Sequence, residues 1–567
     1  MTTIDWIVML GTILSIVAYG VYKTRNVNSV KSYLLGDKDL PWWTIGLSIM
    51  ATQASAITFL STPGQAYNDG MGFAQFYFGL PIAMVILAIF VLPIYYKLNV
   101  YTAYEYLEGR FDLKMRILTS FLFLIQRGLA AGITIYAPAI ILSTIMGWPL
   151  RLTILCIGLL VIFYTVFGGT KAVSVTQKQQ MIIILSGMVL AAVLMVFNLP
   201  QDISFNDALN VAGKMGKLEV VNFEFDWKDR YNIWTGIFGS VFLFLSYFGT
   251  DQSQVQRYLS GKSLSESRLG LLFNGILKVP MQFLVLFVGI LVFVFYQFNQ
   301  PPVHFNNANS ANFVGSQYED LYKERQDTAT IIFNQKQSKI REMLSAMDAD
   351  NETGMQVAKG ELAVLDQLDR NVRDSVKALV ELNTPGAKTD DKDYVFITYI
   401  LNYLPIGIVG LLIAVIFSAA MSSTASELNA LATTSIIDIY RRLIRPNEDD
   451  KHYLWASKMM TILWGGLALL FAIKAELFDN LIQAVNYIGS LFYGAILGVF
   501  AVAFLFKKVK GNAVFYGTIL GEAVVLIFVF LERADTIELA YLWLNPIGCF
   551  AVIIFSLIFQ RSFGEGK

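Results

Sequence analysis

Two apolar stretches contain hydroxyl and small side chains where a membrane helix is ordinarily filled with large apolar ones. The first, Gly46 to Phe59, reads GLSIMATQASAITF, and the second, Phe417 to Asn429, reads FSAAMSSTASELN. A dehydrated sodium ion needs oxygen ligands, which Ser and Thr hydroxyls and the free carbonyls of a broken helix supply. Small residues also allow close helix packing without any ion. Both stretches are candidate ion-binding helices, with close packing as the alternative.

Three charged residues interrupt other apolar runs. Lys278 lies within Phe273 to Val288, and a charge there should face a cavity or an ion partner because lipid solvates it poorly. A snorkelling side chain or a structural ion pair is the alternative. Arg127 is expected to pair with an acid and hold helices together rather than bind solute, and the role of Asp251 stays open.

Polar side chains that could contact a small ligand lie in the first hydroxyl-rich stretch and on a later apolar helix. The candidates are Gln53, Ser55, Thr58, Gln483 and Asn486.

The elements that position these residues are membrane helices. Of 567 residues, 55% are hydrophobic and 15% charged, and the mean hydropathy is +0.54. About thirteen stretches approach the roughly 20 apolar residues that a crossing needs, which predicts an all-α polytopic membrane protein. The predicted spans are 4–23, 42–62, 72–97, 115–145, 149–167, 175–198, 233–258, 269–297, 400–440, 452–473, 479–505, 512–531 and 539–560. The first is interpreted as a retained helix, because no basic leader precedes it.

Positive charges gather in alternate loops. The loops on the other side, such as Pro63 to Met71, are nearly free of Lys and Arg. The positive-inside rule therefore predicts a bacterial inner-membrane protein with its N-terminus outside and its C-terminus in the cytoplasm. The basic side collects Lys23, Arg25, Lys31, Lys38, Lys97, Arg110, Lys114, Arg116, Lys171, Lys178, Arg257, Lys262, Arg268, Arg441, Arg442, Arg445, Lys451, Lys507, Lys508 and Lys510.

Residues 299–393 are polar and acidic, with helical spacing at 331–343 and 357–382. This pattern predicts an extracytoplasmic helical hairpin. A solvated insertion without transport chemistry is one interpretation, and a site for an outer partner or a gating element is the other.

Several function classes are disfavoured. His304 and His452 are the only histidines, and we find no P-loop of the form GxxxxGK[ST]. Cys156 and Cys549 sit in apolar runs, which argues against a redox or zinc site. The net charge of zero argues against nucleic acid as a partner. A membrane enzyme would need a cluster of acids or histidines at one membrane face, which we do not find.

Six short motifs, in this order and spacing, resemble the sodium:solute symporter family. The resemblance covers nearly the whole chain apart from the acidic insertion, and it is nearest to the branch of iodide, monocarboxylate and multivitamin transporters. The motifs are Ser32–Gly36 before Pro41–Trp43, Tyr101–Phe111, Ile135–Pro138, Tyr164–Gly169, Gln256–Arg257 and Ser422–Ser426.

The resemblance implies two inverted repeats of five helices, each beginning with a broken helix, and a sodium site between the repeats. Carried over by position, the sodium ligands are the carbonyls of Ala51, Ala54 and Ala419 and the hydroxyls of Ser422 and Ser423. The implied domains are 1–41 (extra helix and cytoplasmic loop), 42–198 (first repeat), 199–232 (extracytoplasmic loop), 233–298 with 394–506 (second repeat), 299–393 (insertion) and 507–567 (two C-terminal helices).

The chain departs from the family at two places. Gln177 and Lys178 follow Thr176 where some members have an acid associated with sodium exit or a second ion. This difference predicts a single sodium, with a tolerated substitution as the alternative.

Ile57, Thr58 and Tyr77 replace the polar contacts of sugar-transporting members, which makes galactose an unlikely solute. Lys278 and Tyr247 do match a solute-contacting lysine and an aromatic gate.

These observations predict a sodium-coupled symporter for a small solute within the lipid bilayer. A transporter-like sensor that binds solute without moving it is the rival. The solute remains open among organic anions, vitamins, sugars and similar molecules.

Overall fold

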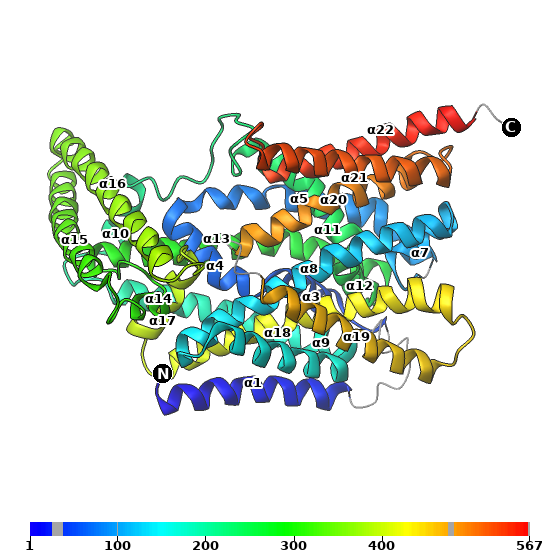
Figure 1. Ribbon diagram of the computed structural model, residues 1–567, viewed down its shortest axis with the longest axis horizontal. Coiled ribbons are helices and arrows are strands. Elements are labelled where there is room, and N and C mark those ends of the chain that lie inside the picture. Colours follow the sequence, from blue (N-terminus) through cyan, green and yellow to red (C-terminus); the bar gives the residue numbers. More distant parts are fainter. Residues whose placement is uncertain (25–37, 99, 475–480, 565–567) are drawn as a thin grey trace.

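The computed structural model describes residues 1–24, 38–98, 100–474 and 481–564, and Arg25, Lys31 and Ser32–Gly36 fall outside these ranges. Figure 1 shows helices running side by side along the long axis of the molecule, with a helical projection at one end. In the described residues the only extended pairing is one isolated bridge, Leu40 to Gly261. The chain is therefore all-α, as predicted.

Nine helical segments among the described residues are long and apolar enough to cross a membrane, and three shorter apolar helices join them. With the short helix α3 (Trp42–Gln53) they account for about thirteen predicted spans. The main spanning helices are α1 (Thr3–Thr24), α8 (Leu113–Met146), α9 (Leu150–Phe197), α13 (Leu264–Phe298), α18 (Ile408–Thr434), α19 (Asp450–Ala472), α20 (Leu481–Leu505), α21 (Gly511–Arg533) and α22 (Leu544–Gly564).

The first hydroxyl-rich stretch is a broken helix. Helix α3 ends at Gln53, Ala54 and Ser55 leave the helical conformation with ψ of 76° and 177°, and α4 (Ala56–Asp69) follows. A 3₁₀ segment (Gly70–Tyr77) then leads into α5 (Gly79–Ile86), a short π-helical stretch and α6 (Leu92–Leu98).

The sequence predicted a loop from Pro63 to Met71, and this prediction is wrong because these residues are helical. Pro63 lies inside α4 because its ring packs in the protein interior, where Gly289 of α13 leaves room for its carbonyl.

A second broken helix begins the other repeat. Helix α11 (Ser240–Gly249) stops before Thr250 and Asp251, where the chain becomes extended with ψ of 119° at Asp251, and α12 (Gln252–Leu259) continues toward the same end of the bundle. The Asp251 side chain caps α12 by accepting a hydrogen bond from the Ser253 N–H. Both repeats therefore start with an interrupted helix, which leaves unpaired backbone groups at mid-depth.

Helix α9 is 48 residues long and is helical throughout, yet it contains two of the predicted membrane spans. A straight helix of this length would span about 70 Å, more than twice a bilayer core. The hydroxyls of Tyr164 and Thr176 nevertheless lie 3.0 Å apart, although twelve residues of straight helix would separate them by about 18 Å. The run therefore folds back between Val166 and Thr176, where two spans are predicted.

The acidic insertion projects from one end of the bundle, called here the insertion end (Figure 1). It contains α14 (Asn307–Ala311), α15 (Glu319–Asp348) and α16 (Glu352–Asn383). Helices α15 and α16 form an antiparallel hairpin held by the ion pairs Lys336–Asp366 at 2.5 Å and Lys339–Glu361 at 2.8 Å. The loop before α11 also contains a helix, α10 (Phe205–Lys214), that the sequence did not predict.

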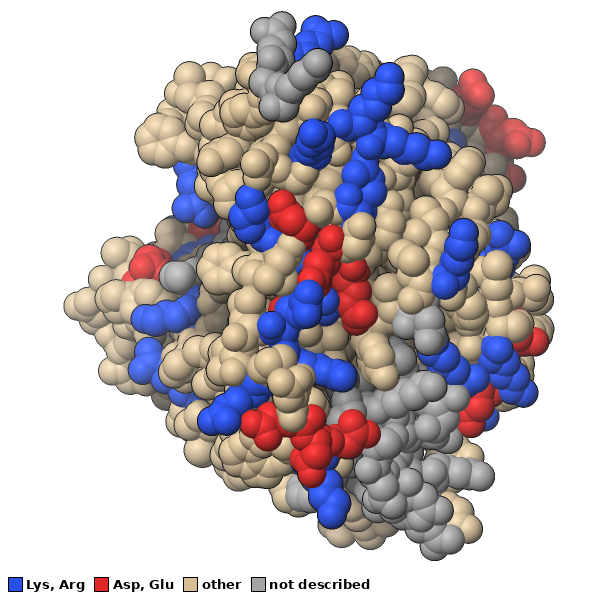
Figure 2. Space-filling view, turned by 90° about the vertical axis from the view of Figure 1, so that its right-hand side faces the viewer, with Lys and Arg blue, Asp and Glu red and all other residues tan. Residues whose placement is uncertain are grey.

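The opposite end, called here the basic end, carries many Lys and Arg side chains around a central group of acids (Figure 2). The short helix α7 (Ala103–Arg110) contributes Glu108, which contacts Arg116 at 2.8 Å. Arg116 also contacts Asp438 at 2.7 Å. Arg257, assigned from sequence to a basic loop, is instead fully buried. Because these pairs join α7, α8 and the π-helical segment Ser435–Ile444 that follows α18, they hold the bundle together at this end.

Candidate functional site

The hydroxyl-rich part of α18 lies against the broken helix α3–α4. Thr52, near the end of α3, lies 3.4 Å from the Ser426 hydroxyl of α18. Ser422, Ser423 and Ser426 are all buried. The two stretches that sequence singled out are therefore neighbours at the centre of the bundle.

The predicted sodium ligands surround this contact. Ala51 and Ala54 belong to the last turn and the cap of α3, where carbonyl groups lose their helical partners. The Ser423 hydroxyl donates to the Ala419 carbonyl at 3.0 Å, whereas the Ser422 hydroxyl is buried without a hydrogen-bond partner. A buried hydroxyl without a partner is costly, and a cation ligand is one way to satisfy it.

Gln177 of α9 occupies the space beside this site. Its amide N–H group donates to Thr52 Oγ1 at 3.0 Å and to Ser426 Oγ at 2.9 Å, and its carbonyl accepts from Ser48. The side chain is completely buried. The residue that replaces the family acid thus joins α3, α9 and α18 as a neutral group, rather than lying at an open helix mouth.

The donor set is neutral. Across the described parts of the chain, no three His, Cys, Asp or Glu side chains come together as a metal site would require. Hydroxyls and carbonyls without a carboxylate suit a monovalent ion better than calcium or zinc.

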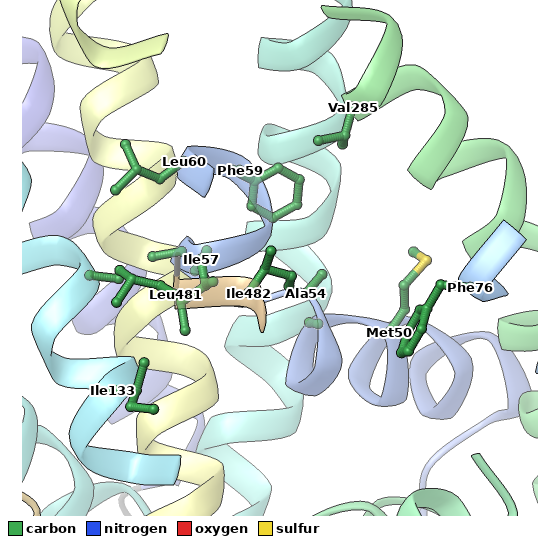
Figure 3. Packing of buried hydrophobic residues seen from close by; sticks show 14 of the residues in the cluster. Met50, Ala54, Ile57, Phe59, Leu60, Phe76, Ile133, Val285, Leu481 and Ile482 are labelled. Atoms are coloured by element: carbon green, nitrogen blue, oxygen red, sulfur yellow. The ribbon is translucent and has the colours of Figure 1, made fainter. Parts of the chain in front are cut away.

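A cavity of about 60 Å³ lies beside the α3–α4 break, with room for a few water-sized groups. Figure 3 shows Ala54 and Ile57 at the break, with Ile482 of α20 close by. Five predicted solute contacts line this cavity: Gln53, Ser55, Tyr77, Tyr247 and Asn486. Its other walls are Thr52, Ile57, Phe76, Arg127, Thr134, Leu243, Phe244, Glu427, Ile482, Val485 and Tyr493.

Four predicted contacts do not line the cavity. Thr58 lies in the first turn of α4 and is buried. Lys278 lies behind Tyr77, its Nζ 5.6 Å from that ring and without a hydrogen bond. The Asp251 carboxyl group caps α12 and forms an ion pair with Arg127.

Gln483 follows Ile482, which lines the cavity, but does not line it itself. It accepts from Arg230 at 2.7 Å and donates to Gln65 of α4 at 3.2 Å. Gln65 in turn donates to Asp69 at 2.9 Å. This chain of polar contacts connects α20, α4 and the loop before α11 above the cavity.

Sequence reasoning missed Glu427 and Tyr493, although it anticipated an acid partner for Arg127. The Arg127 guanidinium contacts Glu427 Oε1 at 3.1 Å, Tyr493 Oη at 2.9 Å and Asp251 Oδ2. The guanidinium also lies 5.2 Å from the Tyr247 ring centre. Glu427 belongs to the hydroxyl-rich stretch that the sequence singles out. Only the fold shows that its side chain contacts Arg127.

The sequence pattern of the sodium:solute symporter family matches residues 33–316 and 376–521. The chain belongs to this family. It is therefore a sodium-coupled symporter rather than an enzyme. The stretch without a match, 317–375, coincides with most of the α15–α16 hairpin.

Curated relatives of this symporter are named for different solutes. The mouse sodium-coupled monocarboxylate transporter 1 is 27% identical over 92% of the chain and 72% of its own length. The sodium/sialic acid symporter of Proteus mirabilis is 26% identical over 100% of the chain and 96% of its length. The human sodium/iodide cotransporter is 33% identical over 47% of the chain and 41% of its length.

A solved structure of a sodium-coupled sialic acid symporter, in a substrate-bound outward-open state, superposes with a TM-score of 0.75 at 23% identity. The match covers 99% of this symporter and 98% of that chain. This similarity confirms the predicted fold of inverted repeats with broken first helices.

Proposed function

We propose that this symporter imports a small solute through the cavity beside the α3–α4 break, driven by one sodium ion bound between α3 and α18. The proposed ligands are the carbonyls of Ala51, Ala54 and Ala419 and the hydroxyls of Ser422 and Ser423. The observation that carries this assignment is the buried Ser422 hydroxyl without a partner, one turn from Ser426 and next to the end of α3.

Sodium at this position would hold the two repeats together at the break. The ion would bridge α3 of the first repeat and α18 of the second, adjacent to Thr52 and Gln53, which line the cavity. A conformation favoured by sodium is then also favoured by solute, and each ligand raises the affinity for the other by the same factor. One charge crossing 100 mV contributes about 2.3 kcal/mol to accumulation.

The proposed solute contacts are Gln53, Ser55, Tyr77, Tyr247 and Asn486 on the cavity wall. Arg127 and Glu427 line the same cavity. Thr58, Asp251, Lys278 and Gln483 act around the cavity rather than in it.

The proposed orientation places the insertion end outside a bacterial inner membrane and the basic end in the cytoplasm. The N-terminus lies at the insertion end and the C-terminus at the basic end (Figure 1). The charges at the basic end support this choice. The repeats are proposed to span 42–198 and 233–506 without the insertion 299–393, which offers a surface for an outer partner.

The deciding experiment is uptake into proteoliposomes against a panel of labelled solutes, with sodium or with potassium as the inward gradient. We expect at least one solute to accumulate only with sodium. Sodium-dependent binding without accumulation of any bound solute would favour the rival, a transporter-like sensor.

A further inference from the structure

One guanidinium and two carboxyl groups meet at the wall of the solute cavity. Arg127 supplies the guanidinium, and Asp251 and Glu427 supply the carboxyl groups. All three are buried, with relative exposures of 2%, 2% and 6%. A low-dielectric interior makes an uncompensated charge costly, so the second carboxyl group is stable as a carboxylate here only with a further positive charge nearby.

The hydrogen bonds show where that charge belongs. Both terminal nitrogens of Arg127 are engaged, one with Glu427 and the other with Asp251 and Tyr493. Asp251 is likewise used on both oxygens, because Oδ1 accepts from the Ser253 N–H and hydroxyl. Glu427 Oε2 makes no hydrogen bond. Arg127 Nε is also without a partner, but both terminal nitrogens of the guanidinium are occupied. The cavity wall therefore presents a free carboxyl oxygen of Glu427.

The remaining walls suit the same kind of ligand. The cavity is lined by the rings of Phe76, Tyr77, Phe244, Tyr247 and Tyr493, and aromatic faces attract organic cations. Gln53 Oε1 is a second acceptor without a partner. Lys278, a positive group in the vicinity, is separated from the cavity by the Tyr77 ring.

We propose that the solute of this symporter carries a protonated amine or another cationic nitrogen, recognised by Glu427 Oε2 and the aromatic walls. This inference deepens the proposed function and rests on its assignment of the cavity to solute. It separates this symporter from the relatives reported above, which are named for monocarboxylates, iodide and sialic acid. An anionic group placed at the same wall would face the acceptor oxygen of Glu427, with both terminal nitrogens of Arg127 already bound.

The test is ligand-dependent thermal stability of the purified full-length protein in sodium-containing buffer. The cationic probes are ethanolamine, choline and putrescine at millimolar concentration, and the anionic probes are iodide, pyruvate and sialic acid. We expect at least one cation to raise Tm in sodium and not in potassium, and no anion to do so. Stabilisation by an anion, or by no cationic probe, overturns the proposal.

Variants locate the effect. Glu427→Gln keeps an oxygen for Arg127 but removes the charge, and should weaken the stabilising cation by about tenfold or more. Glu522→Gln is the matched control, since it removes a carboxylate from α21 that does not line the cavity. Unchanged cation affinity in Glu427→Gln overturns the assignment to Glu427.

The shift in Tm that sodium alone causes distinguishes a failure of this proposal from a failure of the proposed sodium site. Sodium alone should still raise Tm in Glu427→Gln, because the sodium ligands are untouched. If that sodium response disappears instead, Glu427 is the counter-charge of the ion, and the proposal of a cationic solute is overturned while the sodium site stands.

Discussion

Ser422 and Ser423 are adjacent on α18 but differ in what their hydroxyls do. Ser423 donates within its own helix to Ala419 and Ala420 at 3.0 and 3.2 Å, whereas Ser422 has no partner. A buried oxygen without a partner destabilises the sodium-free protein. A bound sodium ion would coordinate this oxygen and so offset the free-energy cost of burying it.

The double variant Ser422→Ala with Ser423→Ala should lose sodium-driven uptake while remaining folded. Removing the unpaired hydroxyl is expected to stabilise the sodium-free protein by about 1 kcal/mol, so its Tm in potassium should rise slightly. Its Tm should no longer respond to sodium. Wild-type uptake rates in this variant would contradict the ligand assignment.

At the level of residues, the sequence signals that led to candidates in the cavity are local ones. Hydroxyl residues strung along an apolar segment stand out in a sequence, and Gln53, Ser55 and Asn486 do line the cavity. The Arg127 cluster could not be found in this way. Its acids lie 124 and 300 residues away along the chain, and only helix packing selects them among the chain's many carboxylates.

At the scale of elements, the loop between α9 and α11 is fastened to the rest of the insertion end through Lys217. The Lys217 carbonyl accepts from the Met71 N–H at 3.0 Å, its ammonium donates to the Asn68 carbonyl, and Nζ lies 4.8 Å from the Phe293 ring centre. Burial lowers the pKa of Lys217 from 10.5 to about 8. The folded state therefore holds this proton less tightly than the unfolded state does.

Because the unfolded chain binds more protons between these two pKa values, Lys217 should make stability rise as pH increases from about 8 to 10.5. The Lys217→Met variant should lack this contribution. The measurement is the difference in Tm between wild type and variant across this pH range, which cancels the titration of other lysines. A difference that stays constant with pH would show that Lys217 titrates normally.

The insertion contacts the bundle through the hairpin, where Gln337 donates to the Phe298 carbonyl at 3.1 Å and Arg341 pairs with Asp202, and also at its membrane-proximal end. At the base of the hairpin, the Asn383 side chain donates to the Asn312 carbonyl at 3.0 Å. Nearer the membrane, His304 Nδ1 lies 3.2 Å from Asp391, and the Lys392 carbonyl abuts Gly64 of α4. Removal of the hairpin therefore breaks its contacts with Phe298 and Asp202 but leaves the contact between Lys392 and α4 in place.

Deleting 313–382 and joining the ends with a short Gly/Ser linker should leave sodium-driven uptake within about threefold of wild type, because the ends already meet. The longer deletion of Pro301 to Pro385 also removes His304, so a further loss there measures the contact with Asp391. Complete loss of uptake in a folded, sodium-responsive short deletion would show that the hairpin belongs to the gate.

For the molecule as a whole, helix count and order followed from hydropathy, because each crossing needs a long apolar stretch. The exact helix ends did not. Pro63 was expected to end a span but lies inside α4, since neighbouring helices in the interior tolerate the missing donor. Helix α10 escaped prediction because a short amphipathic helix in a polar loop has no membrane-length signal.

The whole transport cycle is expected to use one sodium ion per solute. Gln177 fills the space next to the sodium ligands with a neutral amide bonded to Thr52 and Ser426, and this amide provides no negative charge for a second ion. Uptake should show a sodium Hill coefficient near one, and reversal potentials should give one sodium per solute. Two sodium ions per turnover by both measurements would reveal another site.

The proximity of Asn312 and Asn383 also makes this symporter convenient for imaging. A rigid, folded marker protein whose own termini are close together can replace the hairpin between these two residues without stretching either connection. Mounted at the insertion end, such a marker would add an asymmetric feature outside the detergent micelle. Particles of an otherwise featureless membrane protein could then be aligned by electron cryomicroscopy in the presence of each candidate solute.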